Sequence, residues 1–217
     1  MSLKASKGTV KKADAIPTDN YMGRVVQVID LGIQSQREYK GEAKLPVHQI
    51  SVTYELVTEF LKDDDGKDIL DKPRWLSEIF PLYSLDSDLA KSTKRYKVLD
   101  PKEKYGGDWA EVLGSPCLIQ VVEYEKNDGT TGNAVGSISP PLKGVSVPEL
   151  VNETKFFDLD APDLEMFKEM PKWLQTKLTE ERHDHAGSKL EELLGNGGGS
   201  EEKSTGTTDI DEEDVPV

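Results

Sequence analysis

The chain has 217 residues, enough for one domain with an appendage but not for two domains of ordinary size. Charged residues make up 31% and hydrophobic residues only 35%, so we expect part of the chain to stay outside any core. The formal net charge is −14, but residues 149–217 alone carry −12, so the nearly neutral front part is not excluded from binding phosphates.

The first segments of the chain differ in composition. Residues 1–18 include four lysines and no sustained periodicity, which predicts a flexible basic arm. A β-branched and aromatic run from Tyr21 to Leu31 predicts the first strand. Residues 33–46 are polar, basic and interrupted by Gly41 and Pro46, so we expect an exposed loop there.

Two further strands follow. From His48 to Leu56 apolar and polar residues alternate, with His48 on the apolar face, and this period of two predicts a half-buried strand. Residues 63–73 have the composition of a turn. Residues 74–82 then resume an extended pattern, in which Pro81 ends the strand or places it at an edge.

The middle of the chain predicts a helix and then a hairpin. Residues 86–99 can form a helix, and a short helical turn is expected at residues 109–113. The β-like runs 117–124 and 133–139 flank Asp128-Gly129, a dipeptide that favours a hairpin. Three strands, a helix and two strands is the order of an OB-fold barrel. We therefore expect a mainly β protein with a five-stranded OB-like barrel over residues 19–145.

The C-terminal third changes composition after residue 145. We expect residues 146–194 to form a peripheral extension of short helices, with apolar residues at helical spacing that pack back on the barrel or on a neighbour. These are Leu164, Phe167, Trp173, Leu174 and Leu178. Residues 195–217 begin with a Gly-rich linker and continue with acids, which predicts a disordered acidic tail.

The last nine residues, DIDEEDVPV, resemble the tail of bacterial and phage single-stranded-DNA-binding proteins. In that family an acidic run ends in an aliphatic residue, Pro and Phe, and the tip docks in an apolar pocket of partner proteins. The resemblance implies an acidic collar and a tip that recruit replication or repair proteins. Val217 stands where the family has Phe, which implies weaker or retuned binding because less apolar area is buried. The residues are Asp209, Asp211, Glu212, Glu213 and Asp214 for the collar, and Val215, Pro216 and Val217 for the tip.

A second resemblance spans residues 23–178. The phrases GRVVQVIDLG, GSPCLIQVVEYEKNDG and KFFDLDAPDLEMFKEMPKWLQTKL are similar to a group of phage-encoded proteins described as single-stranded-DNA-binding. The resemblance implies a non-enzymatic protein that binds and protects single-stranded DNA during replication, recombination or repair, without a cofactor. An OB-like domain that binds protein, as an adaptor, is the alternative, and a metal-dependent nuclease or recombination enzyme is a further one.

Binding of a single strand requires basic side chains that contact the phosphates and aromatic side chains on which the nucleobases stack. Trp75 and Tyr39 are the preferred stacking platforms because each lies beside basic residues in the sequence. The full set of candidates comprises Arg24, Arg37, Tyr39, Lys40, Lys44, Arg74, Trp75, Lys94, Arg95, Tyr96, Tyr124 and Lys126.

The sequence offers little for other chemistries. Asp63-Asp64-Asp65-Gly66 does not have the acidic spacing of an EF-hand, and RHDH at residues 182–185 lacks a clear third metal ligand. Cys117 is the only cysteine, which excludes an intramolecular disulfide and a cysteine-based zinc cluster. Without an apolar signal core or a run of about 18 apolar residues, we expect a cytoplasmic protein with no membrane partner.

Overall fold

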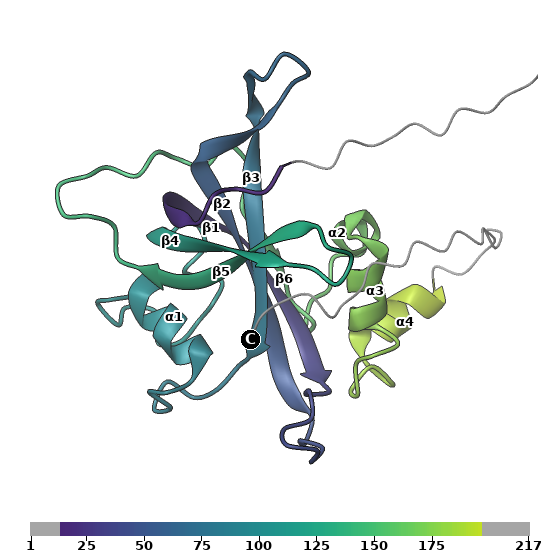
Figure 1. Ribbon diagram of the computed structural model, residues 1–217. Coiled ribbons are helices and arrows are strands. Elements are labelled where there is room, and N and C mark those ends of the chain that lie inside the picture. Colours follow the sequence, from purple (N-terminus) through teal and green to yellow (C-terminus); the bar gives the residue numbers. More distant parts are fainter. Residues whose placement is uncertain (1–13, 197–217) are drawn as a thin grey trace, which may run out of the picture.

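A computed structural model of the protein describes residues 14–196 (Figure 1). The expected order of three strands, one helix and two strands is confirmed, and a sixth strand and three short helices follow. The elements are β1 (Asp19–Gln34), β2 (Val47–Lys62), β3 (Asp68–Pro81), α1 (Lys91–Leu99), β4 (Pro116–Glu125), β5 (Thr131–Ser139), β6 (Lys155–Phe157), α2 (Leu164–Glu169), α3 (Lys172–Leu178) and α4 (Lys189–Asn196).

The first five strands form a strongly curled antiparallel sheet in the order β3-β2-β1-β4-β5, and the short β6 pairs in parallel with β1. Register shifts in β1 at Val25/Gln27 and Asp30/Gly32 bend the sheet, because an extra residue on one strand increases its local twist. The curl brings β3 and β5 into contact at the opposite edges. This is the strand order of an OB barrel, so the predicted mainly β, OB-like fold is confirmed.

The barrel core fills the inner face of the sheet. β2 contributes Ile50, Val52, Tyr54 and Leu56, which is the apolar face that the sequence predicted, while His48 at its end is half-exposed. Helix α1 and the turn after it close one end of the barrel. There Trp109 contacts the rings of Phe80 and Tyr96, with centroid distances of 5.7 and 5.3 Å.

A second apolar core lies on the outer face of β1. Ile29 and Leu31 pack there against Phe157 and the apolar residues of α2, α3 and α4. Figure 1 shows these helices on the opposite side of the sheet from α1. The expected packing of short helices on the barrel is confirmed, and the burial of Phe167, Leu174 and Leu178 accounts for it. We call residues 146–196 the extension.

The extension changes the environment of β2. The alternating pattern predicts one exposed polar face, but Ser51, Thr53 and Glu55 are buried as well. They point away from the barrel core, toward the side that the extension covers. The prediction of a half-buried strand was therefore wrong for residues 51–56, which are buried on both faces.

The structure also corrects the predicted arm and turn. Residues 14–18 are fixed on the barrel: the side chain of Ile16 is buried in its core, and its backbone exchanges two hydrogen bonds of 2.7 Å with the Asn133 side chain. The turn between β2 and β3 is shorter than residues 63–73, because β3 already begins at Asp68. Among the described residues, no helix is both long and apolar enough to cross a membrane.

A buried ion pair joins α1 to the barrel seam. Arg95 Nε and Nη2 lie 2.8 and 3.1 Å from the two carboxylate oxygens of Glu78 on β3. Arg95 also donates to the carbonyl of Gly136 on β5, at 3.2 Å, so one guanidinium connects α1 with both edges of the barrel. Lys91 and the Tyr54 hydroxyl complete the contacts of Glu78.

Replacing Arg95 by Ala should lower the free energy of unfolding by about 3 kcal/mol, because it leaves a buried carboxylate without its bidentate partner. The loss of stability is at the low end of the range for broken buried ion pairs, because Lys91 still pairs with Glu78 in the variant. Urea unfolding measures the effect. Lys94→Ala, on the exposed side of the same helix, is the control and should change stability by no more than about 0.5 kcal/mol. An equally small loss for both variants would contradict the structural role of Arg95.

Candidate nucleic-acid interface

The outer face of β1, β2 and β3 carries a row of polar side chains. Strand register sets Gln27 of β1 opposite Thr53 of β2, and Thr53 opposite Ser77 of β3. The Thr53 and Ser77 hydroxyls are 2.8 Å apart, and the Thr53 hydroxyl also lies 3.5 Å from Gln27 Oε1. Since alternate residues of a strand share a face, Trp75 stands on the same face as Ser77.

A groove of about 250 Å³ lies between this face and the helices α2 and α3. Its sides combine polar side chains of the sheet with apolar side chains of the extension, and Lys155 and Glu169 add one charge of each sign. It is lined by Gln27, Ile29, Ser51, Thr53, Trp75, Ser77, Lys155, Met166, Glu169, Met170, Pro171, Trp173 and Leu174.

Glu55 holds the indole of Trp75 in place. Its carboxylate is fully buried and accepts a hydrogen bond of 3.0 Å from Trp75 Nε1. The same carboxylate accepts from the Val151 amide at 2.6 Å and the Asn152 side chain at 2.7 Å, both in the extension. A buried carboxylate is costly unless donors satisfy it, so these three bonds tie the indole to the extension. Trp75 as a residue remains 40% exposed, as a stacking platform would require.

The loop between β1 and β2 presents the second aromatic platform. Tyr39 and Glu42 exchange two backbone hydrogen bonds around a tight turn. Lys40 and Gly41 have φ angles of 54° and 79°, the left-handed conformation that a two-residue hairpin turn needs. Tyr39 is 58% exposed, and the Nζ atoms of Lys40 and Lys44 lie 5.2 and 5.1 Å from the centroid of its ring. The structure thus places an exposed aromatic ring next to basic side chains, as the sequence predicted.

Two of the predicted site residues lie in the interior. Arg95 forms the buried pair with Glu78, and Tyr96 is a core residue whose hydroxyl donates to the Asp108 carbonyl. Neither can meet a bound strand in this arrangement, which corrects their assignment to the interface. Sequence position alone did not separate them from Lys94, which is exposed on the same helix.

Arg24 is also committed to internal contacts. Its guanidinium donates to the carbonyls of Gly114, Val147 and Pro148 and lies 2.8 Å from Glu149, so it anchors the start of the extension. We therefore assign it a structural role.

The remaining predicted residues are spread over the surface. Arg37 is exposed in the loop of Tyr39, and Arg74 is half-buried on the inner side of β3, where burial lowers its pKa. Tyr124 and Lys126 are half-buried at the β4–β5 hairpin. The tail residues from Asp209 to Val217 lie outside the described residues.

The described residues are strongly acidic. Residues 14–196 contain 22 Lys and Arg against 34 Asp and Glu, a net charge of −12. The extension contributes half of this excess. A net charge of this sign opposes a polyanion, so any binding of one would rely on stacking and on local basic residues such as those around Tyr39.

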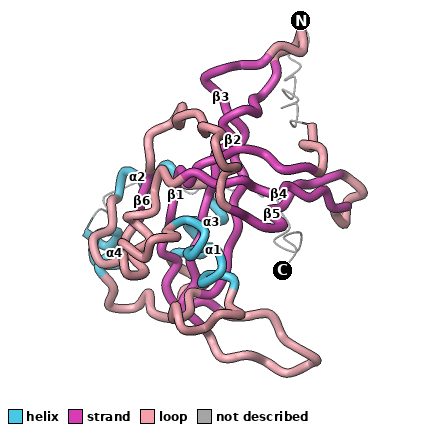
Figure 2. Tube along the Cα trace, turned by 90° about the vertical axis from the view of Figure 1, so that its left-hand side faces the viewer, coloured by secondary structure: helices cyan, strands magenta, loops and turns pink. Residues whose placement is uncertain are grey.

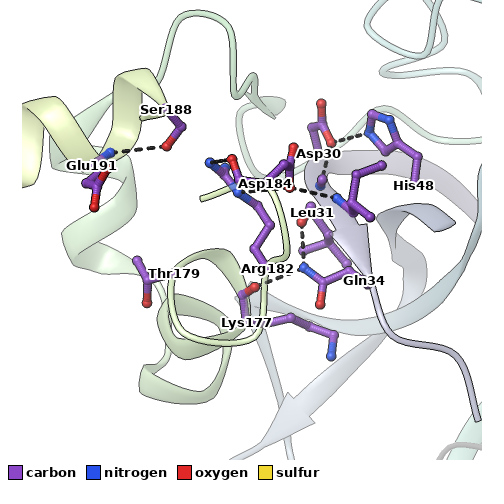
Figure 3. Close-up of polar contacts among 12 residues, drawn as sticks. Asp30, Leu31, Gln34, His48, Lys177, Thr179, Arg182, Asp184, Ser188 and Glu191 are labelled. Atoms are coloured by element: carbon purple, nitrogen blue, oxygen red, sulfur yellow. Dashed lines mark hydrogen bonds and ion pairs between the residues drawn. The ribbon is translucent and has the colours of Figure 1, made fainter. Parts of the chain in front are cut away.

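A polar cluster pins the end of the extension to the first two strands (Figure 3). His48 Nε2 lies 2.5 Å from Asp30 Oδ1, and Asp184 accepts a hydrogen bond of 3.0 Å from the Ile33 amide. Gly32 allows this close approach: its φ is +67°, and a Cβ there would lie 2.5 Å from Arg182 Cδ. The hydrogen bond to Asp30 raises the pKa of His48, with burial opposing it and the charge of Asp184 adding to it.

The RHDH segment belongs to this cluster. His183 Nε2 is 2.8 Å from the Ser35 hydroxyl, and the buried Arg182 donates to the Asp184 carbonyl. Within residues 14–196, no group of three His, Cys, Asp or Glu side chains could hold a metal ion.

Comparison with known proteins returns no relative: no protein-family model, curated protein or solved structure matches the chain. The arrangement of its own side chains is therefore what supports a function.

The His48–Asp30 pair should make stability depend on pH. Because the folded pKa of His48 is raised, the pair contributes fully below the ordinary value of 6.5 and its contribution is lost as pH rises through the folded pKa. The difference in unfolding free energy between the wild type and His48→Gln should therefore be larger at pH 5.5 than at pH 8.5, as urea titrations can measure. In an Asp30→Asn background the His48→Gln difference should no longer vary in this way. A difference that grows with pH would contradict the assignment.

Proposed function

We propose that the protein binds single-stranded DNA, with little sequence preference, along the outer face of β2 and β3. The observation that carries this proposal is the groove, which is lined both by the indoles of Trp75 and Trp173 and by polar side chains of the sheet. OB barrels bind oligonucleotides on this same face and its neighbouring loops. Base stacking on aromatic rings contributes about 1–3 kcal/mol per base and tolerates every base.

The loop that carries Tyr39 is the second contact. It connects β1 to β2, which is the position of one of the two loops that OB barrels use for oligonucleotides. Lys40 and Lys44 stand beside the exposed ring and supply positive charge for phosphates. A strand held by both platforms passes from this loop along the outer face of β3, where Trp75 and Ser77 are exposed, to the groove.

An adaptor that binds protein is the second candidate function. It is favoured by the net charge of −12 on residues 14–196 and by an apolar hollow beside the exposed side chains of Leu142 and Val145. The hollow has a volume of about 200 Å³ and is lined by residues of β1, by Thr58 of β2 and Leu118 of β4, and by Pro141, Leu142, Val145 and Val147. An adaptor would bind no oligonucleotide even at low salt.

Binding of a labelled 30-residue oligo-dT, followed by fluorescence anisotropy, tests the proposal. Trp75→Ala or Tyr39→Ala should weaken binding by about 5- to 150-fold, the equivalent of one lost stacking contact. Affinity should also fall with salt, with a slope of about −0.7 per neutralised phosphate.

Tyr83→Ala removes a similarly exposed ring from the loop before α1 and serves as the matched control. Trp75→Phe keeps a ring and loses only the bond to Glu55, so it separates stacking from stability. The proposal fails if the wild type does not bind oligo-dT in low salt, or if the Tyr83 variant weakens binding as much as the two platform variants.

For the acidic tail we propose the recruitment of replication or repair proteins, on the resemblance of its last nine residues. Removal of residues 209–217 should abolish capture of such partners and leave the folded domain intact. Pull-down by the full chain and by the shortened chain, with equal thermal stability of both, is the measurement. Capture that persists without the tail would move the partner site to the domain.

A further inference from the structure

Building on the single-stranded-DNA-binding function above, we propose that the groove holds one unpaired nucleobase, taken out of the strand and enclosed by both the barrel and the extension. The site is composite: Trp75 comes from β3, whereas Trp173 comes from α3. Neither part of the chain forms it alone.

The size of the groove fits a single ring system. Its volume of about 250 Å³ is below the roughly 300–1,000 Å³ of pockets for drug-sized ligands. Trp173 and Ile79 both pack against the second apolar core, and Ile79 follows Trp75 by four residues, about 13 Å further along β3. Trp75, Ser77 and Trp173 all line the groove, and its volume has room for one base but not for a longer run of stacked nucleotides.

The floor of the groove offers hydrogen bonds to the edge of a base. Gln27 lines it, and among the described residues its amide Nε2 has no hydrogen-bond partner. The hydroxyls of Thr53 and Ser77 lie beside it. A partly buried amide donor favours a ligand that carries a carbonyl or ring-nitrogen acceptor, because such a ligand satisfies it. Nucleobases carry these acceptors on a flat ring.

The charges of the groove cancel, which favours a neutral ligand over a phosphate. Lys155 and Glu169 both line it, with Lys155 Nζ 3.3 Å from Glu169 Oε2. The buried Glu55 behind Trp75 is satisfied by three donors. A phosphate would meet one paired cation and one nearby carboxylate, whereas a base brings no charge. The sugar and phosphates of the bound nucleotide therefore stay outside.

The indole N–H signals of the three tryptophans report directly on this pocket. In a ¹H–¹⁵N spectrum of the full chain, oligo-dT should shift the signals of Trp75 and Trp173 and leave that of Trp109, buried in the barrel core, unchanged. Trp75→Phe and Trp173→Phe assign the peaks, since each variant loses one. Trp173→Ala should weaken oligo-dT binding by about tenfold or more, and Trp173→Phe much less.

Two further ligands identify what enters the groove. A short strand in which every nucleotide is abasic should leave both indole signals in place, and free thymidine monophosphate at high concentration should shift both more weakly than oligo-dT does. A shift of both signals by the abasic strand would overturn the base pocket, as would a shift by thymidine monophosphate that exceeds the shift by oligo-dT.

The pocket and the proposed function fail in distinguishable ways. Oligo-dT that binds without moving the Trp75 and Trp173 signals overturns the pocket and leaves DNA binding intact. If the chain binds no oligonucleotide at low salt, both the base pocket and the proposed DNA binding are overturned.

Discussion

Strands β1 and β2 are covered on both faces, and this double burial determines where the other parts of the protein lie. On the inner side Val52 and Tyr54 fill the barrel, while on the outer side Ile29 packs beneath the extension. Each square ångström of apolar surface kept from water contributes about 25 cal/mol, so detaching the extension would expose the second core at a considerable cost. The extension is thus an integral layer of the domain, and it decides how much of the β2–β3 face remains open.

Two buried acids fix how the layers dock. Glu78 points to the inner side, where Arg95 of α1 satisfies it, and Glu55 points to the outer side, where Asn152 of the extension does so. Leaving either carboxylate without donors would cost more free energy than the hydrogen bonds themselves contribute. Each acid therefore favours the one arrangement of α1 or of the extension in which its donors are in place. Glu55 links this structural role to the candidate site because it also binds Trp75. The geometry of the groove therefore depends on the correct docking of the extension.

The sequence was sufficient for the barrel because each barrel strand has a local signature. The alternation from Ile50 to Leu56 and the hairpin signal at Asp128-Gly129 depend on neighbouring residues only. The three-residue β6 has no such signature, since it is defined by pairing with β1, more than 120 residues earlier in the chain. The burial of Ser51 and Thr53 was equally hidden, because it results from a layer contributed by a distant segment.

The candidate site divides along the same line. Trp75 and Tyr39 were found because an aromatic next to bases is a local pattern, and the structure leaves both exposed. Trp173 and Gln27 were missed, one having been read as a packing residue of a helix and the other as an ordinary strand residue. Cross-strand register and the docking of α3 bring Gln27 and Trp173 to the same groove as Trp75. The spacing of residues along the sequence does not indicate either of these. For Arg95 the local pattern was misleading. Its place in a run of basic residues predicted an exposed contact for DNA, but its side chain is buried and pairs with Glu78.

The negative charge of the domain restricts how a nucleic acid can be held. With a net charge of −12 over residues 14–196, long-range attraction would not supply most of the affinity in the proposed DNA binding, and repulsion is screened beyond about 8 Å at physiological salt. Contacts that do not depend on charge must then dominate, and stacking on exposed indole and phenol rings is such a contact. An acidic surface also discourages a rigid duplex, which brings twice the phosphate charge and no free base faces. For the DNA binding proposed above, a groove with cancelling charges beside an exposed tryptophan would favour single strands over a duplex, because single strands carry less phosphate charge and offer free base faces.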